Sequence, residues 1–186
     1  LLIALYQKNI TALMYSDDHG KTWQPGALNA FSGACEPSIV ELSDGRVIVS
    51  PRIGPRVGPK PPGRLFLISN DGGAGFAATR YERAIPIPGQ GELLAYDPPD
   101  GTGSEQVRPI IFCGAAEGKT RLTLTISLDD GRTWPISRII DDGSAANLAL
   151  VALPQRQIGV LYERDKYRRL AFQRVDLDAV IKESTP

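Results

Sequence analysis

Three stretches of this chain share one pattern, which decides its fold. They read Ser16-Asp17-Asp18-His19-Gly20-Lys21-Thr22-Trp23, Ser69-Asn70-Asp71-Gly72-Gly73-Ala74-Gly75-Phe76 and Ser127-Leu128-Asp129-Asp130-Gly131-Arg132-Thr133-Trp134. Their common frame is S-x-D-x-G-x-x-[WF]. In a tight turn the Asp carboxylate accepts backbone hydrogen bonds, the Gly adopts a positive φ, and the Ser or Thr hydroxyl caps a neighbouring amide. The pattern therefore predicts three copies of one hairpin turn, each anchored by an aromatic residue.

The sequence around these turns predicts short β-strands. Each copy follows a strand-like run, at residues 12–15, 64–68 and 121–126. Further strands are expected at residues 38–42, 46–50, 109–113, 148–153, 158–162 and 170–175. Residues 42–46 read Leu-Ser-Asp-Gly-Arg, a hairpin with an Asp-Gly turn. Because residues 176–183 are the one helical candidate, the predicted class is all-β.

The spacing of the three copies predicts a β-propeller. The pattern recurs after 53 and then 58 residues, which suits one four-stranded antiparallel blade per repeat. A chain of 186 residues then holds about three and a half blades, whereas closed propellers have about four to eight. We therefore expect residues 1–186 to form a partial propeller domain. Its ring is closed either by blades missing at the N-terminus, which the abrupt start at Leu1 favours, or by a second chain in a homodimer.

Composition excludes several functional classes. Lys and Arg number 21, as do Asp and Glu, so no net charge favours nucleic acid. No apolar run approaches the roughly 18–20 residues of a membrane span. Two cysteines without a CxxC motif, no glycine-rich phosphate loop and no calcium-loop motif mean that no metal and no cofactor are expected. His19, the one histidine of the sequence, is interpreted as a turn residue.

The three copies resemble Asp-boxes, the BNR repeats of sialidases (neuraminidases) and other propeller proteins, where they sit on peripheral turns away from the active site. A second stretch, residues 34–52, is similar to the sialidase sequence E-x-x-x-x-E-L-x-D-G followed by a strand that ends in Arg. Glu36 and Arg52 are 16 positions apart, as in that family. Residues 89–94 and 158–163 resemble its Q-G-S-L-L and G-x-L-Y-E elements. The match runs in order from residue 15 to about residue 172, and it implies the C-terminal half of a six-bladed propeller.

The resemblance implies an exo-α-sialidase, a glycoside hydrolase that removes terminal sialic acid from glycoconjugates. Its ligand is then a sialylated glycan or another acidic sugar. In the family, arginines bind the sugar carboxylate, a Tyr is the nucleophile, a neighbouring Glu takes its proton and an Asp is the general acid. Glu36 matches the Glu, and Arg52 matches the second of three carboxylate-binding arginines. Glu36 could instead be a solvated carboxylate at a strand end.

The third arginine has two candidates. The family places it eight residues before the Asp-box Ser, which here is Lys119. Arg121 lies six residues before Ser127, and two positions along a strand keep the same face, so Arg121 is the preferred candidate. The proline-rich residues 53–63 follow Arg52 and form either a rim loop over the sugar site or a plain hairpin connection.

The nucleophile position departs from the family. Counting back from Leu153 places Asn147 where sialidases have the Tyr, and an amide cannot form the covalent intermediate. The first arginine and the general-acid Asp belong to N-terminal blades in the family. Two functions therefore compete: a sialidase-like hydrolase in which this chain holds part of the site, and a non-catalytic sialidase-like propeller that binds acidic sugars. A purely structural propeller is a third alternative, against which the Glu36–Arg52 spacing argues.

Overall fold

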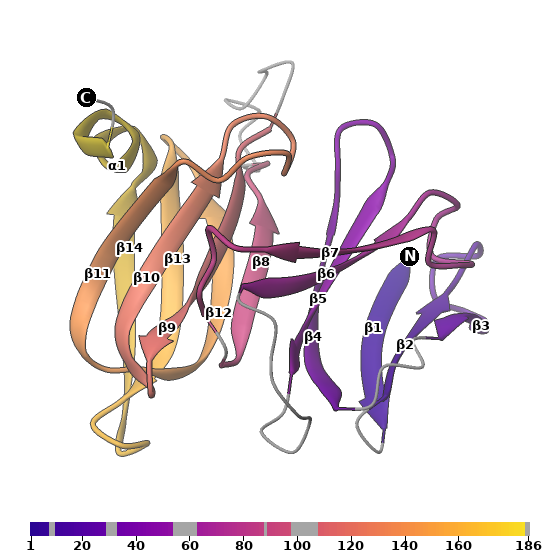
Figure 1. The fold of residues 1–186 in the computed structure, drawn as a ribbon, viewed down its shortest axis with the longest axis horizontal. Coiled ribbons are helices and arrows are strands. Elements are labelled where there is room, and N and C mark those ends of the chain that lie inside the picture. The colour runs from indigo at the N-terminus through magenta and orange to yellow at the C-terminus, as the bar shows by residue number, and fades with distance from the viewer. Residues whose placement is uncertain (8–9, 29–32, 54–62, 88, 98–107, 185–186) are drawn as a thin grey trace. The chain divides into compact units, whose positions relative to one another are not determined.

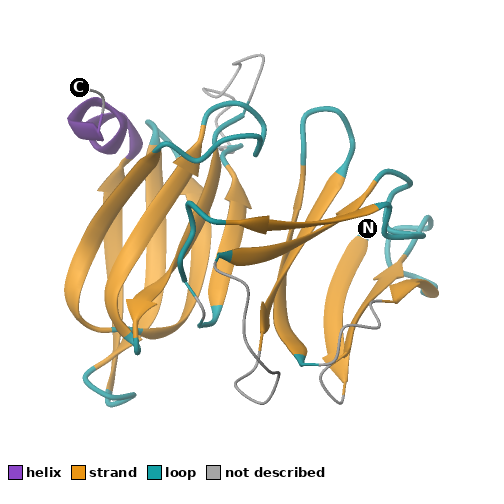
Figure 2. Cartoon of the chain, in the orientation of Figure 1, coloured by secondary structure: helices purple, strands orange, loops and turns teal. Residues whose placement is uncertain are grey.

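The computed structural model describes residues 1–7, 10–28, 33–53, 63–87, 89–97 and 108–184. In this part of the chain the structure has antiparallel β-strands and one helix at the C-terminal end (Figures 1 and 2). The predicted all-β class is therefore confirmed. The strands fall into two units, Leu1–Pro88 and Gly89–Pro186, which are described separately below.

The first unit contains two antiparallel sheets. One has three strands in the order β1-β2-β3, and the other has four in the order β4-β5-β6-β7. Their bounds are β1 Leu2–Gln7, β2 Ile10–Tyr15, β3 Gln24–Leu28, β4 Ala34–Glu41, β5 Val47–Ile53, β6 Arg64–Ser69 and β7 Ala78–Glu82. Consecutive strands are neighbours in each sheet, which is the meander expected of propeller blades.

The second unit repeats this arrangement. A four-stranded sheet has the order β11-β10-β9-β8, and a three-stranded sheet has the order β12-β13-β14. Their bounds are β8 Gly91–Ala95, β9 Ile110–Glu117, β10 Thr120–Ser127, β11 Ile136–Ser144, β12 Ala146–Leu153, β13 Gln157–Arg164 and β14 Arg169–Asp176. Helix α1, Leu177–Ser184, follows β14 and agrees with the helical candidate at residues 176–183.

Each unit has an apolar core. The first packs buried side chains of β2, β3, β5 and β6, among them Leu13, Val49 and Leu67. The second core is larger and joins its two sheets and α1, with Ile126, Val160 and Leu177 fully buried. Gly91 allows close packing here, because a Cβ at this position would lie 2.3 Å from the Phe112 ring. The alternating apolar residues noted in the sequence thus face these cores.

The three Asp-boxes form the same hydrogen-bonded turn. In the third, the Ser127 hydroxyl donates to Asp129 (2.8 Å) and accepts from the Gly131 amide (2.8 Å), while Asp129 accepts from the Thr133 amide (2.8 Å) and hydroxyl (2.6 Å). The first box makes the same four contacts. The second has Gly75 in place of the Thr, so the hydroxyl contact is missing there. These bonds give the predicted turn its shape.

Hydrogen bonds also set the acidity of the box carboxylates. In the first box, the Thr22 hydroxyl and amide, together with the Ser16 hydroxyl, lower the pKa of Asp18 from 3.8 to about 2. The Gly75 amide is the main cause of the lowered pKa of Asp71. All of these donors belong to the same turn as the carboxylate. We therefore infer that the ionised Asp side chains stabilise the turn and do not bind a substrate.

Candidate functional site

Glu36 and Arg52 form an ion pair at one end of the first unit's four-stranded sheet. Glu36 lies near the start of β4 and Arg52 near the end of β5, and Cys35 pairs with Arg52 in the ladder. Nη1 of Arg52 donates to both carboxylate oxygens of Glu36, at 3.0 and 2.8 Å. Both side chains are 31% exposed, so solvent and a ligand can reach the pair. The structure thus brings together the two residues that the sequence resemblance predicts.

The backbone at Glu36 is irregular. The β4–β5 register shifts between Cys35 and Ser38, so β4 carries an extra residue there. Glu36 has φ +45°, although the following Pro37 ordinarily favours an extended conformation in the residue before it. A β-bulge of this kind turns a side chain away from the direction that the strand would give it, and such bulges are common beside active sites.

A buried arginine supports the end of β5. Arg64, at the start of β6, is 2% exposed. Its Nε donates to the Ser50 hydroxyl (2.7 Å), and its Nη2 donates to the Ser50 carbonyl (3.1 Å). Ser50 lies two residues before Arg52, so these bonds fix the strand that carries the candidate ligand-binding arginine. This role was not predictable from the sequence, because Arg64 begins an otherwise apolar strand.

Asn147 lies at a second bulge, in the second unit. The β12–β13 register shifts between Ala146 and Leu148, so Asn147 is the extra residue of β12. Its side chain is exposed, and its amide donates to Glu163 at 2.9 Å. The neighbouring Leu148 backbone is held by the Gln90 side chain, which accepts from the Leu148 amide at 3.2 Å. Glu163 and Gln90 belong to the two short elements that supported the resemblance, but the sequence did not assign them these contacts.

The tyrosine that pairs with this bulge cannot take over the role of a nucleophile. Tyr162 is 3% exposed, and its hydroxyl donates to the Asp141 carboxylate at 2.5 Å. Burial and this hydrogen bond raise the pKa of Tyr162 to about 12. Arg164 also lies 3.3 Å from Asp141. Tyr162 is thus a protonated structural residue that joins β11 to β13.

Arg121 is the second residue of β10 in the second unit, and Lys119 lies in the turn directly before that strand. Both have left-handed backbone, with φ +58° for Arg121 and +72° for Lys119. The β10–β11 register shifts between Thr120 and Leu122, so Arg121 stands at an irregularity, as Glu36 and Asn147 do. The expectation that Arg121 keeps the strand face of position 119 requires extended backbone at both positions. Because both residues have positive φ, that expectation does not establish where the Arg121 side chain lies. Its role, like that of Glu36, Arg52 and Asn147, stays a prediction.

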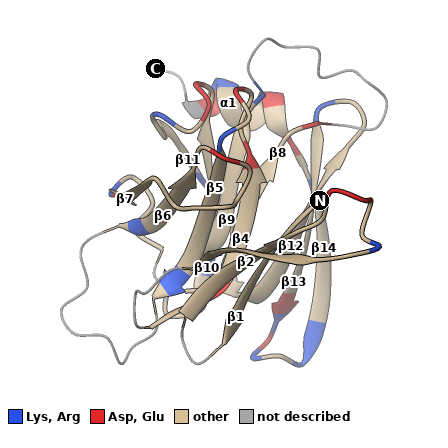
Figure 3. Cartoon of the chain, turned by 90° about the vertical axis from the view of Figure 1, so that its right-hand side faces the viewer, with Lys and Arg blue, Asp and Glu red and all other residues tan. Residues whose placement is uncertain are grey.

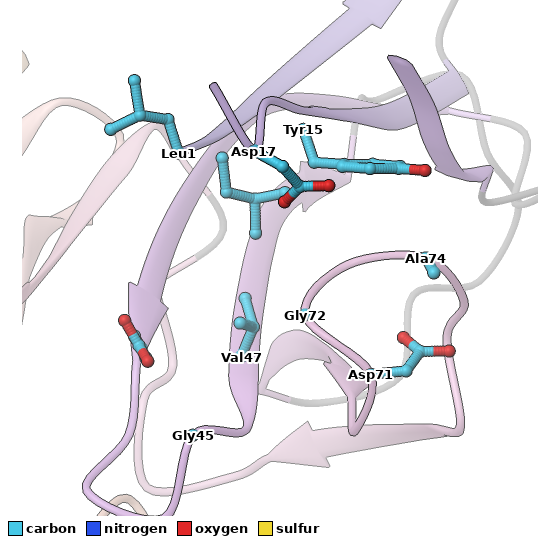
Figure 4. A pocket seen from close by; sticks show the side chains of 10 residues that line it. Leu1, Tyr15, Asp17, Gly45, Val47, Asp71, Gly72 and Ala74 are labelled. Carbon is cyan, nitrogen blue, oxygen red and sulfur yellow. The ribbon is translucent and has the colours of Figure 1, made fainter. Parts of the chain in front are cut away.

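A cavity of about 440 Å³ lies at the other end of the first unit (Figure 4). It is lined by Tyr15 and Val47 and by the carboxylates of Asp17 and Asp71, which come from the first two Asp-boxes. Val47 begins β5, whereas Arg52 lies near its end. This cavity is therefore separate from the Glu36–Arg52 pair, and we do not assign the sugar site to it.

The described residues contain no group of three or more His, Cys, Asp or Glu residues that could hold a metal ion. No helix among them is long and apolar enough to cross a membrane. Most of the proline-rich segment after Arg52, residues 54–62, lies outside the described part, so its two interpretations stay open.

Comparison with known proteins agrees with the fold and the Asp-boxes. Residues 1–170 match the model of the BNR repeat-like domain. A sialidase from Micromonospora viridifaciens is 37% identical over 153 residues, which are 81% of this chain and 23% of that protein. The Hadza microbial sialidase Hz136 has a similar structure, with a TM-score of 0.70 and 24% identity over 91% of this chain and 32% of its own. Trypanosoma rangeli sialidase follows, with a TM-score of 0.65 and 19% identity over 94% of this chain and 28% of its own.

The fold and the repeated turns define a partial β-propeller with Asp-boxes. The chain belongs to the BNR repeat-like domain family, and the predicted resemblance to sialidases is confirmed. It spans less than a quarter of the length of the curated sialidase that it matches.

Proposed function

We propose that this chain is part of a sialidase-like glycoside hydrolase that cleaves terminal sialic acid from glycoconjugates. The observation that carries the proposal is the Glu36–Arg52 pair, held at a bulge with both side chains accessible. A guanidinium recognises a carboxylate through several fixed N–H groups, and sialic acid carries a carboxylate on its anomeric carbon. Arg52 would bind that carboxylate, with Arg121 or Lys119 as a further cation.

Asn147 alters the step that follows binding. In the sialidase mechanism a Tyr attacks the anomeric carbon after a Glu has taken its proton, and an amide at this position has no such proton to give. A carboxylate can instead take a proton from a water molecule, whose oxygen then bonds to the anomeric carbon. The bond from that carbon to the aglycone oxygen breaks in the same step, and this oxygen takes a proton from the general acid, which the resemblance assigns to N-terminal blades. We assign the role of the general base to Glu36. The sugar would then leave with inverted configuration, whereas a Tyr nucleophile gives retention.

Hydrolysis of a fluorogenic sialoside by the complete protein tests this proposal. Glu36→Gln is expected to lower kcat by about 10²–10⁴, because it removes the general base. Arg52→Lys is expected to raise KM by about ten- to a hundredfold, because it removes charge-assisted hydrogen bonds. Proton NMR of the first product shows which anomer forms.

Glu41→Gln and Arg46→Lys are matched controls on the same β4–β5 hairpin. Glu41 ends β4 and pairs with Val47, and Arg46 contacts Asp44 at 2.7 Å. Both are expected to leave hydrolysis unchanged. Equal losses in these controls, or full activity in Glu36→Gln, would contradict the assigned roles.

The second candidate function is a non-catalytic propeller that binds acidic sugars. Asn147 favours it, because the amide is already engaged with Glu163 at 2.9 Å. Trypanosoma rangeli sialidase has been solved with the inhibitor DANA, a sialic acid analogue that also suits a binding assay here. Binding of DANA without turnover of sialosides would favour this candidate. Asn147→Tyr then separates the two: hydrolysis gained by this variant would mean that the rest of the site is intact.

We also propose that further β-sheet covers an apolar face in each unit. In the first unit the β1–β3 sheet exposes Ile3 and Leu28 on one face. In the second, the β12–β14 sheet exposes a larger group, namely Val151, Leu161, Leu170 and Phe172. Additional blades or a second copy of the chain would bury such patches. The mass in solution, compared with the mass of one complete polypeptide, distinguishes the two: further blades lengthen the polypeptide itself beyond these 20.1 kDa, whereas a second copy gives particles of twice the polypeptide mass.

A further inference from the structure

The first unit's four-stranded sheet contains two arginines at neighbouring strand ends. Charged residues are concentrated in the turns and at the ends of the strands (Figure 3), and Arg52 and Arg64 follow this pattern. Arg52 is the last residue but one of β5, and Arg64 is the first residue of β6. Their environments differ, because the Arg52 side chain is 31% exposed and pairs with Glu36, whereas Arg64 is 2% exposed.

The ladder between β5 and β6 is shorter than the two strands. Among the described residues it ends at the Val49–Leu67 pair. β5 nevertheless continues for four residues beyond Val49, and β6 begins three residues before Leu67. A continued ladder would place Arg52 directly opposite Arg64, and like charges in that position are unfavourable. The end of β5 that carries Arg52 therefore lies beyond the last pair with β6, although it still pairs with β4 through Cys35.

The backbone of Arg64 is held on the side away from β5. Arg64 pairs with Glu82 at one end of the continuous β6–β7 ladder. Gly63 allows this close approach, because a Cβ there would lie 2.3 Å from the Glu82 carbonyl oxygen. Nη1 of Arg64 also donates to the Ile87 carbonyl at 3.4 Å. The side chain that reaches β5 thus starts from a strand that is firmly placed.

The Arg64 guanidinium binds β5 just past the last ladder pair. Ser50 is fully buried, so its hydroxyl and its carbonyl both need partners inside the protein. Nε of Arg64 donates to the hydroxyl and Nη2 to the carbonyl, at 2.7 and 3.1 Å. A rigid planar guanidinium makes two such bonds in fixed directions, whereas an ammonium is a point charge on a flexible stem. The direction of the backbone at Ser50, and so the position of Arg52 two residues later, depends on this fork.

We propose that Arg64 is a positioning residue that fixes the Arg52 guanidinium for the carboxylate of an acidic sugar. The inference rests on the proposed function, in which Arg52 binds that carboxylate. Recognition of a carboxylate by an arginine fork is strongly geometric, so a small displacement of the strand end weakens it. Arg64 is buried and acts on the ligand only through Ser50 and Arg52. The preference for an acidic sugar then depends on a residue that the sugar does not touch.

Binding of DANA and of its methyl ester to the complete protein, measured by calorimetry, tests the inference. The ester lacks the negative charge, so the ratio of the two affinities reports on recognition of the carboxylate. Arg64→Lys keeps the charge but removes the fork, and it is expected to lower the affinity for the acid by about three- to tenfold and to leave the ester nearly unchanged. Ser50→Ala removes one of the two bonds and is expected to lower the ratio about twofold. Ser50→Ala decides the question if Arg64→Lys does not fold.

Arg80→Lys is the matched control in the same sheet. Arg80 lies in β7, one strand further from Arg52, and its guanidinium lies 5.5 Å from the centre of the Phe66 ring. This variant is expected to leave the ratio of the two affinities unchanged. A role of Arg64 in stability alone would give the same pattern, namely a lower urea midpoint with an unchanged ratio, and would overturn the inference.

A second comparison shows whether Arg64 acts through Arg52. Arg52→Lys should itself lower the preference for the acid, and Arg64→Lys or Ser50→Ala added to it should cause no further loss. An equal loss for acid and ester in the single variants, or a further loss of preference in the Arg52→Lys background, would overturn the inference while leaving the proposed function in place. A wild-type protein that does not prefer the acid, or an Arg52→Lys variant that keeps the full preference, would instead overturn the proposed function.

Discussion

The left-handed backbone at Glu36 leads to a prediction that separates stability from function. Glu36 has φ +45°, a conformation in which a residue with a Cβ is unfavourable by about 1–2 kcal/mol and glycine is not. If the strained conformation serves to direct the carboxylate toward Arg52, removing the side chain should release the strain. We therefore predict that Glu36→Gly is more stable than Glu36→Ala, although both lose the carboxylate.

The size of the difference follows from two opposing terms. Glycine avoids the cost of about 1–2 kcal/mol at positive φ, but it adds about 0.5–1 kcal/mol of backbone entropy to the unfolded chain. The net advantage of Gly over Ala at position 36 is about 1 kcal/mol. The ion pair with Arg52 does not enter, because both variants lack it. At Glu41, an exposed residue of the same strand outside the left-handed positions, the order should reverse, with Ala ahead by about 0.5–1 kcal/mol.

Urea denaturation of the four variants, at positions 36 and 41, measures these differences through the midpoint and the slope. The free energy of unfolding should be higher for Gly than for Ala at position 36, and higher for Ala than for Gly at position 41. Hydrolysis of a sialoside should be lost in both Glu36 variants and kept in both Glu41 variants. An Ala variant at position 36 that equals or exceeds the Gly variant in stability would refute the reasoning.

Two further predictions concern the Asp-boxes. The pKa of Asp18 is lowered from 3.8 to about 2 on folding, chiefly by Thr22, so the stability that this carboxylate contributes is present above pH 3.8 and lost as the pH falls toward 2. The difference in melting temperature between wild type and Asp18→Asn should therefore shrink over that range, and a constant difference would contradict it. Ser127→Ala leaves the buried Gly131 amide without its acceptor, so a loss of about 1–3 kcal/mol is expected in urea denaturation. The exposed Ser137→Ala is its control, and equal effects in the two variants would show that the buried hydroxyl is unimportant.

The local parts of the fold were the most predictable from the sequence. An Asp-box is a turn whose donors and acceptors lie within a few residues of one another, so its pattern specifies its shape without tertiary information. The strands and the helix after β14 followed from apolar alternation and from turn residues. Arg64 was not predictable in this way, because its burial depends on Ser50, which lies 14 residues earlier in the chain.

The candidate site was predictable in part. The spacing of Glu36 and Arg52 placed them together through a resemblance, and the structure shows the contact. The bulges that direct these side chains were not visible, because a bulge depends on the register between two strands, which sequence alone does not show. The same limit affected the choice between Lys119 and Arg121, since the period of two assumes extended backbone at both positions.

In each unit, one end of the strands carries an Asp-box turn, and the other end carries the candidate site residues. In the first, Ser69 ends β6 beside Val47 and opens an Asp-box, while Arg52 lies toward the opposite end of β5. In the second, Lys119 and Ser127 flank β10 at its two ends. The box ends are held by hydrogen bonds within each turn, whereas the other ends carry the candidate site residues beside shifts of strand register. Under the proposed function, a change in the site such as Asn147 therefore leaves the Asp-box turns that stabilise the strands as they are.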